Sequence, residues 1–236
     1  MPIARARTDD GIVTGERDGE TLRTDEGTYT IGESAELLAP CEPSALYCVG
    51  RNYAETIELR GYDRPDVPEF FIKPPTSVLG PEEGIPYPTF SEEVTYAGEL
   101  AAVIGERCRN VSEAAALDYV RGYTIMNDVD ALDQNSVTAR KAFDGSGPLG
   151  PHVATDVDPT DIDMYTDVNG ERRQEANTSS MLFDPAEVIA FLSERLTLRP
   201  DDVVAFGSPA NPGTIEPGDV VEITYEGVGT LRNEVR

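Results

Sequence analysis

The sequence predicts a mixed α/β fold that is mainly β-sheet. Apolar runs of strand length recur along the chain with turn residues between them, whereas only two segments carry the signals of a helix start. The composition does not shift at any point in a way that marks a second large domain. At 236 residues, the chain is long enough to bury one substantial core.

Residues 1–45 are expected to form a small N-terminal β subdomain. Two strand-like pieces, GIVTGERDG and EGTYTIG, lie here among Asp-Gly, Glu-Gly and Gly-Glu turn signals. Residues 46–236 are expected to form the main domain. Its predicted strands are LYCVG, FFIK, VTYAGELAAVIG, GYTIMND, IDMYTDVNG, DVVAFG and DVVEITYEG.

Two helices are expected in the main domain. Ser112 can cap a helix over SEAAALDYVRG, which Gly122 would end. Asp184 can cap a second helix over PAEVIAFLSERL. Pro185 would take its first position, where a helix needs no backbone N–H donor.

The charge of the chain is extreme. Its formal net charge is −25 with a pI near 4.2, and only two of its 19 basic residues are lysine. The acidic residues are spread along the chain, so they do not form a disordered acidic tail. Such a surface is typical of salt adaptation, and we expect a halophilic archaeal source. Nucleic acid is excluded as a partner because phosphate binding needs a basic face.

The start of the chain, MPIARARTDDG, holds no apolar signal segment, and no apolar run approaches the roughly 20 residues that span a bilayer. We therefore expect a cytoplasmic protein without a membrane partner. Cys41, Cys48 and Cys108 match no C-x-x-C pattern, so they are expected to be ordinary reduced cysteines.

Two carboxylates stand in otherwise apolar runs. Glu99 lies inside VTYAGELAAVIG, and Asp128 closes YTIMND. Because burying an unpaired carboxylate costs several kcal/mol, we expect both to share a cation or to serve a binding site. The structural alternative is that Glu99 pairs with a core arginine and that Asp128 only ends its strand.

An ordered series of motifs resembles the fumarylacetoacetate hydrolase family. The series is YCVGRNY, FFIKPP, NDVDALDQ, KAFDGSGPLGP, VNGERRQEANTSSM, VVAFGSP and the tail GDVVEITYEGVGTLRNEV. The resemblance implies a rolled mixed β-sheet with a few flanking helices. It also implies a homodimer that acts on small oxo-acids or β-diketo acids by C–C hydrolysis, decarboxylation, hydration or isomerisation. Three carboxylates of the family hold a divalent ion.

The resemblance assigns Glu99 and Asp128 as metal ligands, but the first glutamate of the family is Ala97 here. We therefore expect Mg²⁺ or Mn²⁺, or else Ca²⁺, to be weakly bound or absent. Glu93 would lie too far from Glu99 on an ideal strand to replace the lost ligand. Asp130 is an added carboxylate. An extended backbone would turn it toward the same side as Asp128, and a turn would leave it as a solvated loop acid, which is the interpretation we favour.

Other family positions have also changed. A lid histidine and glutamate are replaced by Thr56 and Leu59, and an arginine that holds a substrate carboxylate is replaced by Leu132. His152 is the only histidine, and without an orienting partner it is expected to be structural.

Both lysines of the chain, Lys73 and Lys141, fall on family lysine positions. The resemblance makes Lys141 the catalytic residue that stabilises negative charge on an oxo-acid. The structural alternative for Lys141 is an ion pair with Asp144 or Glu99.

The resemblance also places substrate contacts within the YCVGRNY and FGSP segments. The residues are Arg51, Tyr53, Gly207 and Ser208. Two functions remain open from the sequence. One is a divalent-metal enzyme of oxo-acid catabolism, and the other is a non-catalytic family member that binds or regulates.

Overall fold

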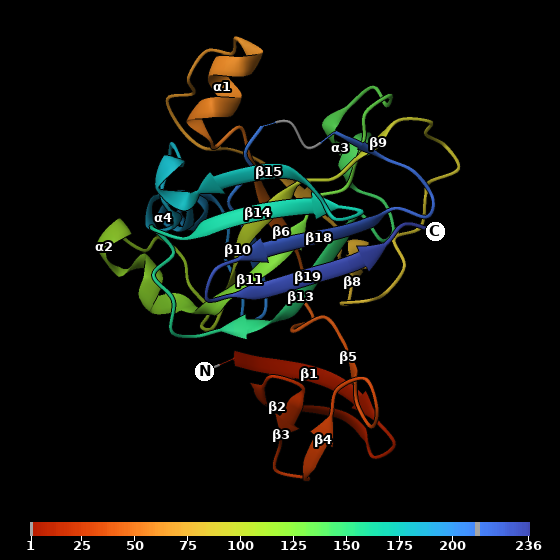
Figure 1. Ribbon diagram of the computed structural model, residues 1–236. Coiled ribbons are helices and arrows are strands. Elements are labelled where there is room, and N and C mark those ends of the chain that lie inside the picture. Colours follow the sequence, from red (N-terminus) through yellow and green to blue (C-terminus); the bar gives the residue numbers. More distant parts are fainter. Residues whose placement is uncertain (1, 211–212) are drawn as a thin grey trace.

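The computed structural model describes residues 2–210 and 213–236 (Figure 1). Its N-terminal strands lie at the bottom of Figure 1 and enclose a small core of their own, which includes Ala4, Val13 and Leu22. These strands are β1 (Pro2–Thr8), β2 (Gly11–Asp18), β3 (Thr21–Arg23), β4 (Thr28–Thr30) and β5 (Glu36–Leu37). Strand β1 pairs with a strand of the main sheet, and a domain boundary at residue 45 stays a prediction.

A large mixed sheet forms the centre of the molecule. Its path runs β4-β3-β2-β1-β13-β11-β10-β16-β6-β7, with β8 attached to β13. Most neighbours are antiparallel, whereas β16 and β6 run parallel. The strands beyond the N-terminal ones are β6 (Leu46–Gly50), β7 (Glu69–Lys73), β8 (Val78–Leu79), β10 (Gly98–Ile104), β11 (Val120–Asn127), β13 (Gly147–Ala154) and β16 (Val203–Ala205).

Two smaller sheets complete the main part of the fold. The four-stranded sheet has the order β15-β14-β18-β19 and lies across the front of the central sheet in Figure 1. The second is a short sheet with the order β12-β9-β17. The bounds are β9 (Val94–Thr95), β12 (Asp130–Ala131), β14 (Asp163–Val168), β15 (Glu171–Asn177), β17 (Thr214–Ile215), β18 (Val220–Tyr225) and β19 (Gly229–Glu234).

Strand β10 is buried on both faces because a core lies on each side of it. Leu100 and Ile104 belong to the larger core, which also contains residues of the four-stranded sheet such as Ile223. Ala101 and Val103 point the other way, into a second core. Glu99 shares the face of Ala101 and Val103 by the same two-residue period.

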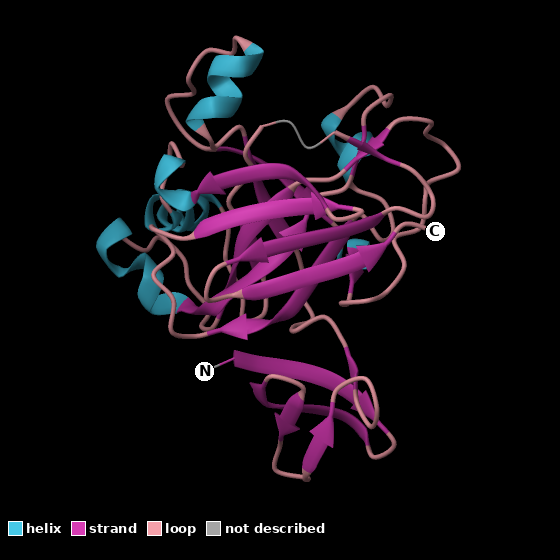
Figure 2. Ribbon diagram, viewed as in Figure 1, coloured by secondary structure: helices cyan, strands magenta, loops and turns pink. Residues whose placement is uncertain are grey.

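Few helices accompany the sheets (Figure 2). They are α1 (Ala54–Arg60), α2 (Glu113–Ala116), α3 (Val137–Lys141) and α4 (Pro185–Arg195), with 3₁₀ turns η1 (Pro75–Ser77), η2 (Leu117–Tyr119) and η3 (Thr178–Ser180). The prediction for α4 is confirmed, since the Asp184 side chain accepts the Glu187 N–H and Pro185 starts the helix. Within the described residues, no helix is long and apolar enough to cross a membrane.

Two predictions about local structure were wrong. The helix after Ser112 does not reach Gly122, because Val120 already begins β11, and the Ser112 side chain makes no capping bond. The apolar run from residue 94 to 105 is not one strand either. It breaks at Tyr96 and Ala97, so β9 pairs in the short sheet and β10 in the central one.

Candidate active site

The two carboxylates singled out in the sequence lie at the same end of the central sheet. Glu99 stands opposite Met126 in the β10–β11 ladder, and Asp128 follows the last residue of β11. The Asp128 N–H donates to the carbonyl of Ala97 at 2.9 Å, which holds the two chain segments together. Both side chains are buried, with Glu99 3% and Asp128 2% exposed.

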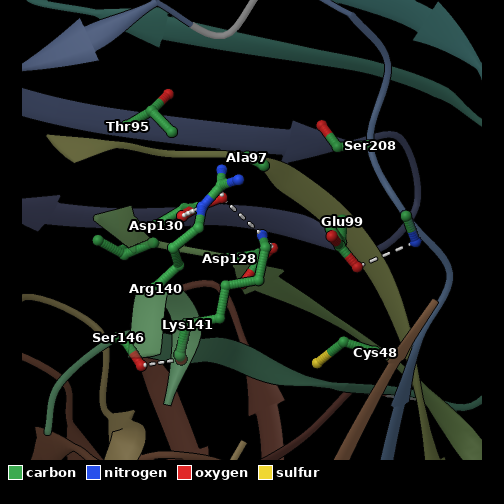
Figure 3. A network of polar contacts seen from close by, with 12 residues as sticks. Cys48, Thr95, Ala97, Glu99, Asp128, Asp130, Arg140, Lys141, Ser146 and Ser208 are labelled. Atoms are coloured by element: carbon green, nitrogen blue, oxygen red, sulfur yellow. Dashed lines mark hydrogen bonds and ion pairs between the residues drawn. The ribbon is translucent and has the colours of Figure 1, made fainter. Parts of the chain in front are cut away.

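Both carboxylates border a cavity of about 590 Å³. Figure 3 shows Glu99 entering the site from β10, and Arg140 and Lys141 entering from α3. The short sheet, the loop after β16, the start of α1 and residues of β6 and β7 also line the cavity. The polar side chains of the lining belong to Arg51, Thr56, Tyr62, Glu93, Thr95, Tyr96, Glu99, Asp128, Asp130, Arg140, Lys141, Ser208 and Thr214.

Lys73 is completely buried beneath the cavity. Its ammonium group donates to the carbonyl oxygens of Val129, Lys141 and Ser146 at 3.0, 2.6 and 2.9 Å. It also lies 2.9 Å from Asp128 Oδ1 as an ion pair. Because the three carbonyls take all three protons of the ammonium, Asp128 Oδ1 is left without a hydrogen bond.

Lys141 lies in the cavity wall with 17% of its side chain exposed. Its ammonium group donates to Asp128 Oδ2 and lies 3.2 Å from Asp130 Oδ2. Burial opposes its charge, but Asp128 and then Asp130 outweigh burial and raise the pKa of Lys141. Asp128 and Asp130 therefore take the place of Asp144 and Glu99, which were considered as ion-pair partners from the sequence.

Asp130 is not the solvated loop acid that the sequence favoured. It lies on β12 opposite Thr95 and is 5% exposed. The guanidinium group of Arg140 binds both of its oxygens, with Nε to Oδ1 at 2.8 Å and Nη2 to Oδ2 at 2.6 Å. Sequence reasoning missed Arg140. Its position directly before Lys141 was the available signal, because it places a second cation on the same short segment.

Glu99 is held by the backbone of the loop after β16. The Gly207 N–H donates to Glu99 Oε2 at 2.9 Å. Burial, and then the negative charge of Asp128, raise the pKa of Glu99 to about 8. The pKa of Asp128 shifts the other way, because Lys141 and Lys73 outweigh its burial and lower it.

Gly207 and Ser208 both line the cavity, as a substrate-contact role would require. Gly207 has φ of +85°, and a Cβ there would come within 3.0 Å of Asn52 and of the Val49 carbonyl, so the turn requires glycine. The Ser208 hydroxyl accepts a hydrogen bond from Gln174 at 2.8 Å. Gln174 lies on β15, so the four-stranded sheet positions this loop.

Arg51 and Tyr53 differ in placement. Arg51 lines the cavity, where its guanidinium group pairs with Glu69 and lies 5.0 Å from the ring centre of Tyr62. Tyr53 is 1% exposed, pairs with Met181 in an isolated β-bridge and is not a lining residue. The substrate-binding role of each residue stays a prediction.

The remaining candidates from the sequence lie in different parts of the structure. Thr56 lines the cavity, and its hydroxyl donates to the Ser208 carbonyl at 3.4 Å, whereas Leu59 is 56% exposed on α1. His152 lies away from the site, with Nδ1 3.3 Å from Arg17 of β2. Burial and then Arg17 lower the pKa of His152 to about 4, which agrees with a structural role. The three cysteines are free and buried.

The positions of the carboxylates show whether they could hold a divalent ion. Glu99 and Asp128 face one cavity, and a cation between them would offset the burial and mutual repulsion of two carboxylates. Ala97 lines the same cavity and supplies no ligand. Within the described residues, no three His, Cys, Asp or Glu side chains form a metal-binding group. The residues therefore fit an ion held by two carboxylates, less firmly than by three.

Comparison with known proteins identifies relatives over the full length. The chain is 40% identical over 259 residues to Protein Rv2993c of Mycobacterium tuberculosis, covering 100% of this chain and 98% of that protein. A 2-hydroxyhepta-2,4-diene-1,7-dioate isomerase structure from Mycobacterium marinum matches with a TM-score of 0.92 and 38% identity, covering 100% and 98% of the two chains.

A more distant structure carries ligands. Fumarylpyruvate hydrolase from Pseudomonas aeruginosa, in complex with Mn²⁺ and pyruvate, matches with a TM-score of 0.78 and 31% identity over 87% of this chain and 94% of that one. The family model for the fumarylacetoacetate (FAA) hydrolase C-terminal domain matches residues 45–236. With fold, motifs and full-length relatives in agreement, this chain belongs to the fumarylacetoacetate hydrolase family.

Proposed function

We propose that this protein is an enzyme that converts a small oxo-acid through its enolate, by decarboxylation rather than by hydrolysis. The observation that carries the proposal is the position of Lys141. Its ammonium group, held by Asp128 and Asp130, borders a cavity of about 590 Å³ in a chain that has only one other lysine. A fixed cation at the wall of a partly closed cavity stabilises the oxygen of an enolate as its charge develops.

The choice of reaction follows from what the cavity lacks. Hydrolysis needs a group that activates water, and Thr56 and Leu59 supply neither an acid nor a base at the lid positions. Decarboxylation of a β-oxo acid makes no such demand. The C–C bond to the carboxylate breaks, its electron pair forms the enolate, carbon dioxide leaves, and the enolate takes a proton from solvent.

The proposal includes a weakly held Mg²⁺ or Mn²⁺ ion. Glu99 and Asp128 would hold it, and the bound ion would supply further polarisation of the oxo group. Lys141 and Lys73 neutralise Asp128 from two sides, which lowers the attraction of this carboxylate for a metal. A homodimer stays part of the proposal on the strength of the family resemblance alone.

Oxaloacetate consumption in the presence of Mn²⁺ tests the proposal. Because Mn²⁺ alone promotes the reaction, each rate is compared with that of Lys141→Met at equal metal and protein concentration. The wild type should exceed this background at least tenfold, and Lys141→Arg should retain part of the difference because it keeps a cation. Asp144→Asn, next to the same helix and outside the cavity lining, is the matched control. Equal rates for the wild type and Lys141→Met would refute the assignment.

A binding protein without turnover is the second candidate. One observation favours it: the cavity cations Arg51, Arg140 and Lys141 are each already paired with a carboxylate. A repaired variant, Thr56→His, Leu59→Glu and Ala97→Glu, separates the two candidates. If only the repaired variant turns over oxaloacetate or an acylpyruvate, the natural chain is a binding protein on an intact scaffold.

A further inference from the structure

Arg140 and Asp130 form a pair in the cavity, and Arg140 has no role in the reaction proposed above. Arg140 comes from α3 and Asp130 from β12, and both line the cavity with Lys141. Leu132, two residues beyond Asp130, lines the same cavity and offers no side-chain hydrogen-bond donor. The guanidinium group of Arg140 in the same cavity comes from α3, a different element of the chain.

The Arg140–Asp130 contact is built to hold the guanidinium group in one orientation. Asp130 is 5% exposed, and its two oxygens take Nε and Nη2 of Arg140 at 2.8 and 2.6 Å. Two parallel charge-assisted bonds fix the plane of an arginine, which a single contact would not do. The pair is partly buried, with 32% of the Arg140 side chain exposed.

One edge of the guanidinium group is left for a ligand. In the described part of the chain, the hydrogen bonds of Arg140 to side chains use Nε and Nη2 only, so Nη1 has no partner there. A guanidinium group has five N–H donors, and Asp130 occupies two of them. A planar, pre-oriented donor pair facing a cavity matches the geometry of a carboxylate.

Lys141 fixes where that carboxylate would lie relative to the reacting group. Its Nζ lies 3.2 Å from the same Asp130 oxygen that Arg140 Nη2 contacts at 2.6 Å. Two cations on one oxygen atom are close enough to contact neighbouring oxygens of a single small ligand. The oxo group and the carboxylate of a 2-oxo acid are such neighbours.

We propose that Arg140, oriented by Asp130, binds the carboxylate next to the oxo group of a 2-oxo acid while Lys141 faces the oxo oxygen. This inference rests on the proposed function and names a specificity residue within its site. The short α3 segment thus carries two adjacent residues that recognise the two parts of one functional group.

Binding of two stable probes, 2-oxobutyrate and 2-oxoglutarate, measured by calorimetry on the full chain, tests the inference. Both share the 2-oxo carboxylate unit, so Arg140→Met should weaken both by roughly ten- to a hundredfold, as expected when a charged hydrogen-bond donor is lost. Arg140→Lys should recover part of the affinity for both. Arg172→Met is the matched control, because Arg172 also pairs with carboxylates but lies outside the cavity lining on β15.

Arg140→Met leaves Asp130 as a buried charge, so the double variant Arg140→Met with Asp130→Ser is measured beside it. A folded double variant with the same loss of affinity supports direct recognition of the carboxylate. Affinities within twofold of the wild type in either variant would overturn the inference and leave the proposed function standing. If the folded wild type binds neither probe, both the inference and the proposed function are wrong.

Discussion

Replacing Lys73 by methionine should cost far more stability than replacing Lys141, although both lysines contact the same aspartate. Lys73 is fully buried, donates three hydrogen bonds to backbone carbonyls and forms an ion pair with Asp128 at 2.9 Å. Removing one partner of a buried pair costs about 3–5 kcal/mol. Lys141 still pairs with Asp128 in this variant, but three carbonyl oxygens lose the donor that Lys73 supplies. Such a loss is a large part of the roughly 5–15 kcal/mol that holds a domain folded.

Lys141→Met is expected to cost less than half as much. Its side chain is partly exposed, and after its removal Lys73 still neutralises Asp128 while Arg140 still holds Asp130. Urea unfolding at constant KCl concentration gives both differences in free energy of unfolding. In the double variant Lys73→Met with Asp128→Asn, part of the loss should return because the Asp128 charge that Lys73 neutralised is also gone. A loss below about 1 kcal/mol for Lys73→Met, or equal losses for the two lysines, would refute this account.

Three further outcomes are expected. Mn²⁺ affinity by calorimetry should fall in Asp128→Asn and should rise about tenfold, roughly 1.4 kcal/mol, in Ala97→Glu; affinity unchanged by both would place the ion elsewhere. The melting temperature should drop as KCl is lowered from molar to about 0.1 M, because the Debye length then reaches roughly 10 Å and the acidic side chains behind the net charge of −25 repel one another. A melting temperature that stays constant or rises would contradict the prediction of salt adaptation. Folding lowers the pKa of His152 to about 4, whereas its pKa in the unfolded chain is about 6.5. Its contribution to stability is therefore present above pH 6.5 and is lost as the pH falls through 4. The urea midpoint of His152→Gln should fall less steeply over this pH range than that of the wild type, and parallel curves would contradict this expectation.

The sequence predicted those features whose signals lie within a few neighbouring residues. Asp184 and Pro185 marked the start of α4 because a capping side chain and a first-turn proline act locally. Glu99 and Asp128 were recognised because carboxylates in apolar runs need a partner, and the β10–β11 register brings them to one end of the sheet.

The rest depended on contacts between different elements of the chain. Helix α3 has only five residues, too few to show a helical period, so Arg140 was missed. Asp130 looked solvated because nothing local reveals that Arg140 binds it. The break at Tyr96 and Ala97 was missed although Gly98 follows it, since pairing of Thr95 with β12 and β17, which imposes the break, cannot be read from the run itself.

Strand β10, packed between two cores, gives the cavity one rigid wall, whereas other lining residues come from short helices that could be exchanged. The Glu99 carboxylate is borne by a strand in which every residue is buried, so its position cannot drift without opening both cores. The short segments α1 and α3, which carry Thr56 and Arg140, are not packed between two cores in this way. An engineer could therefore exchange α1 and the residues of α3 before Lys141 to change which acid is accepted, while Glu99 and Lys141 keep their positions.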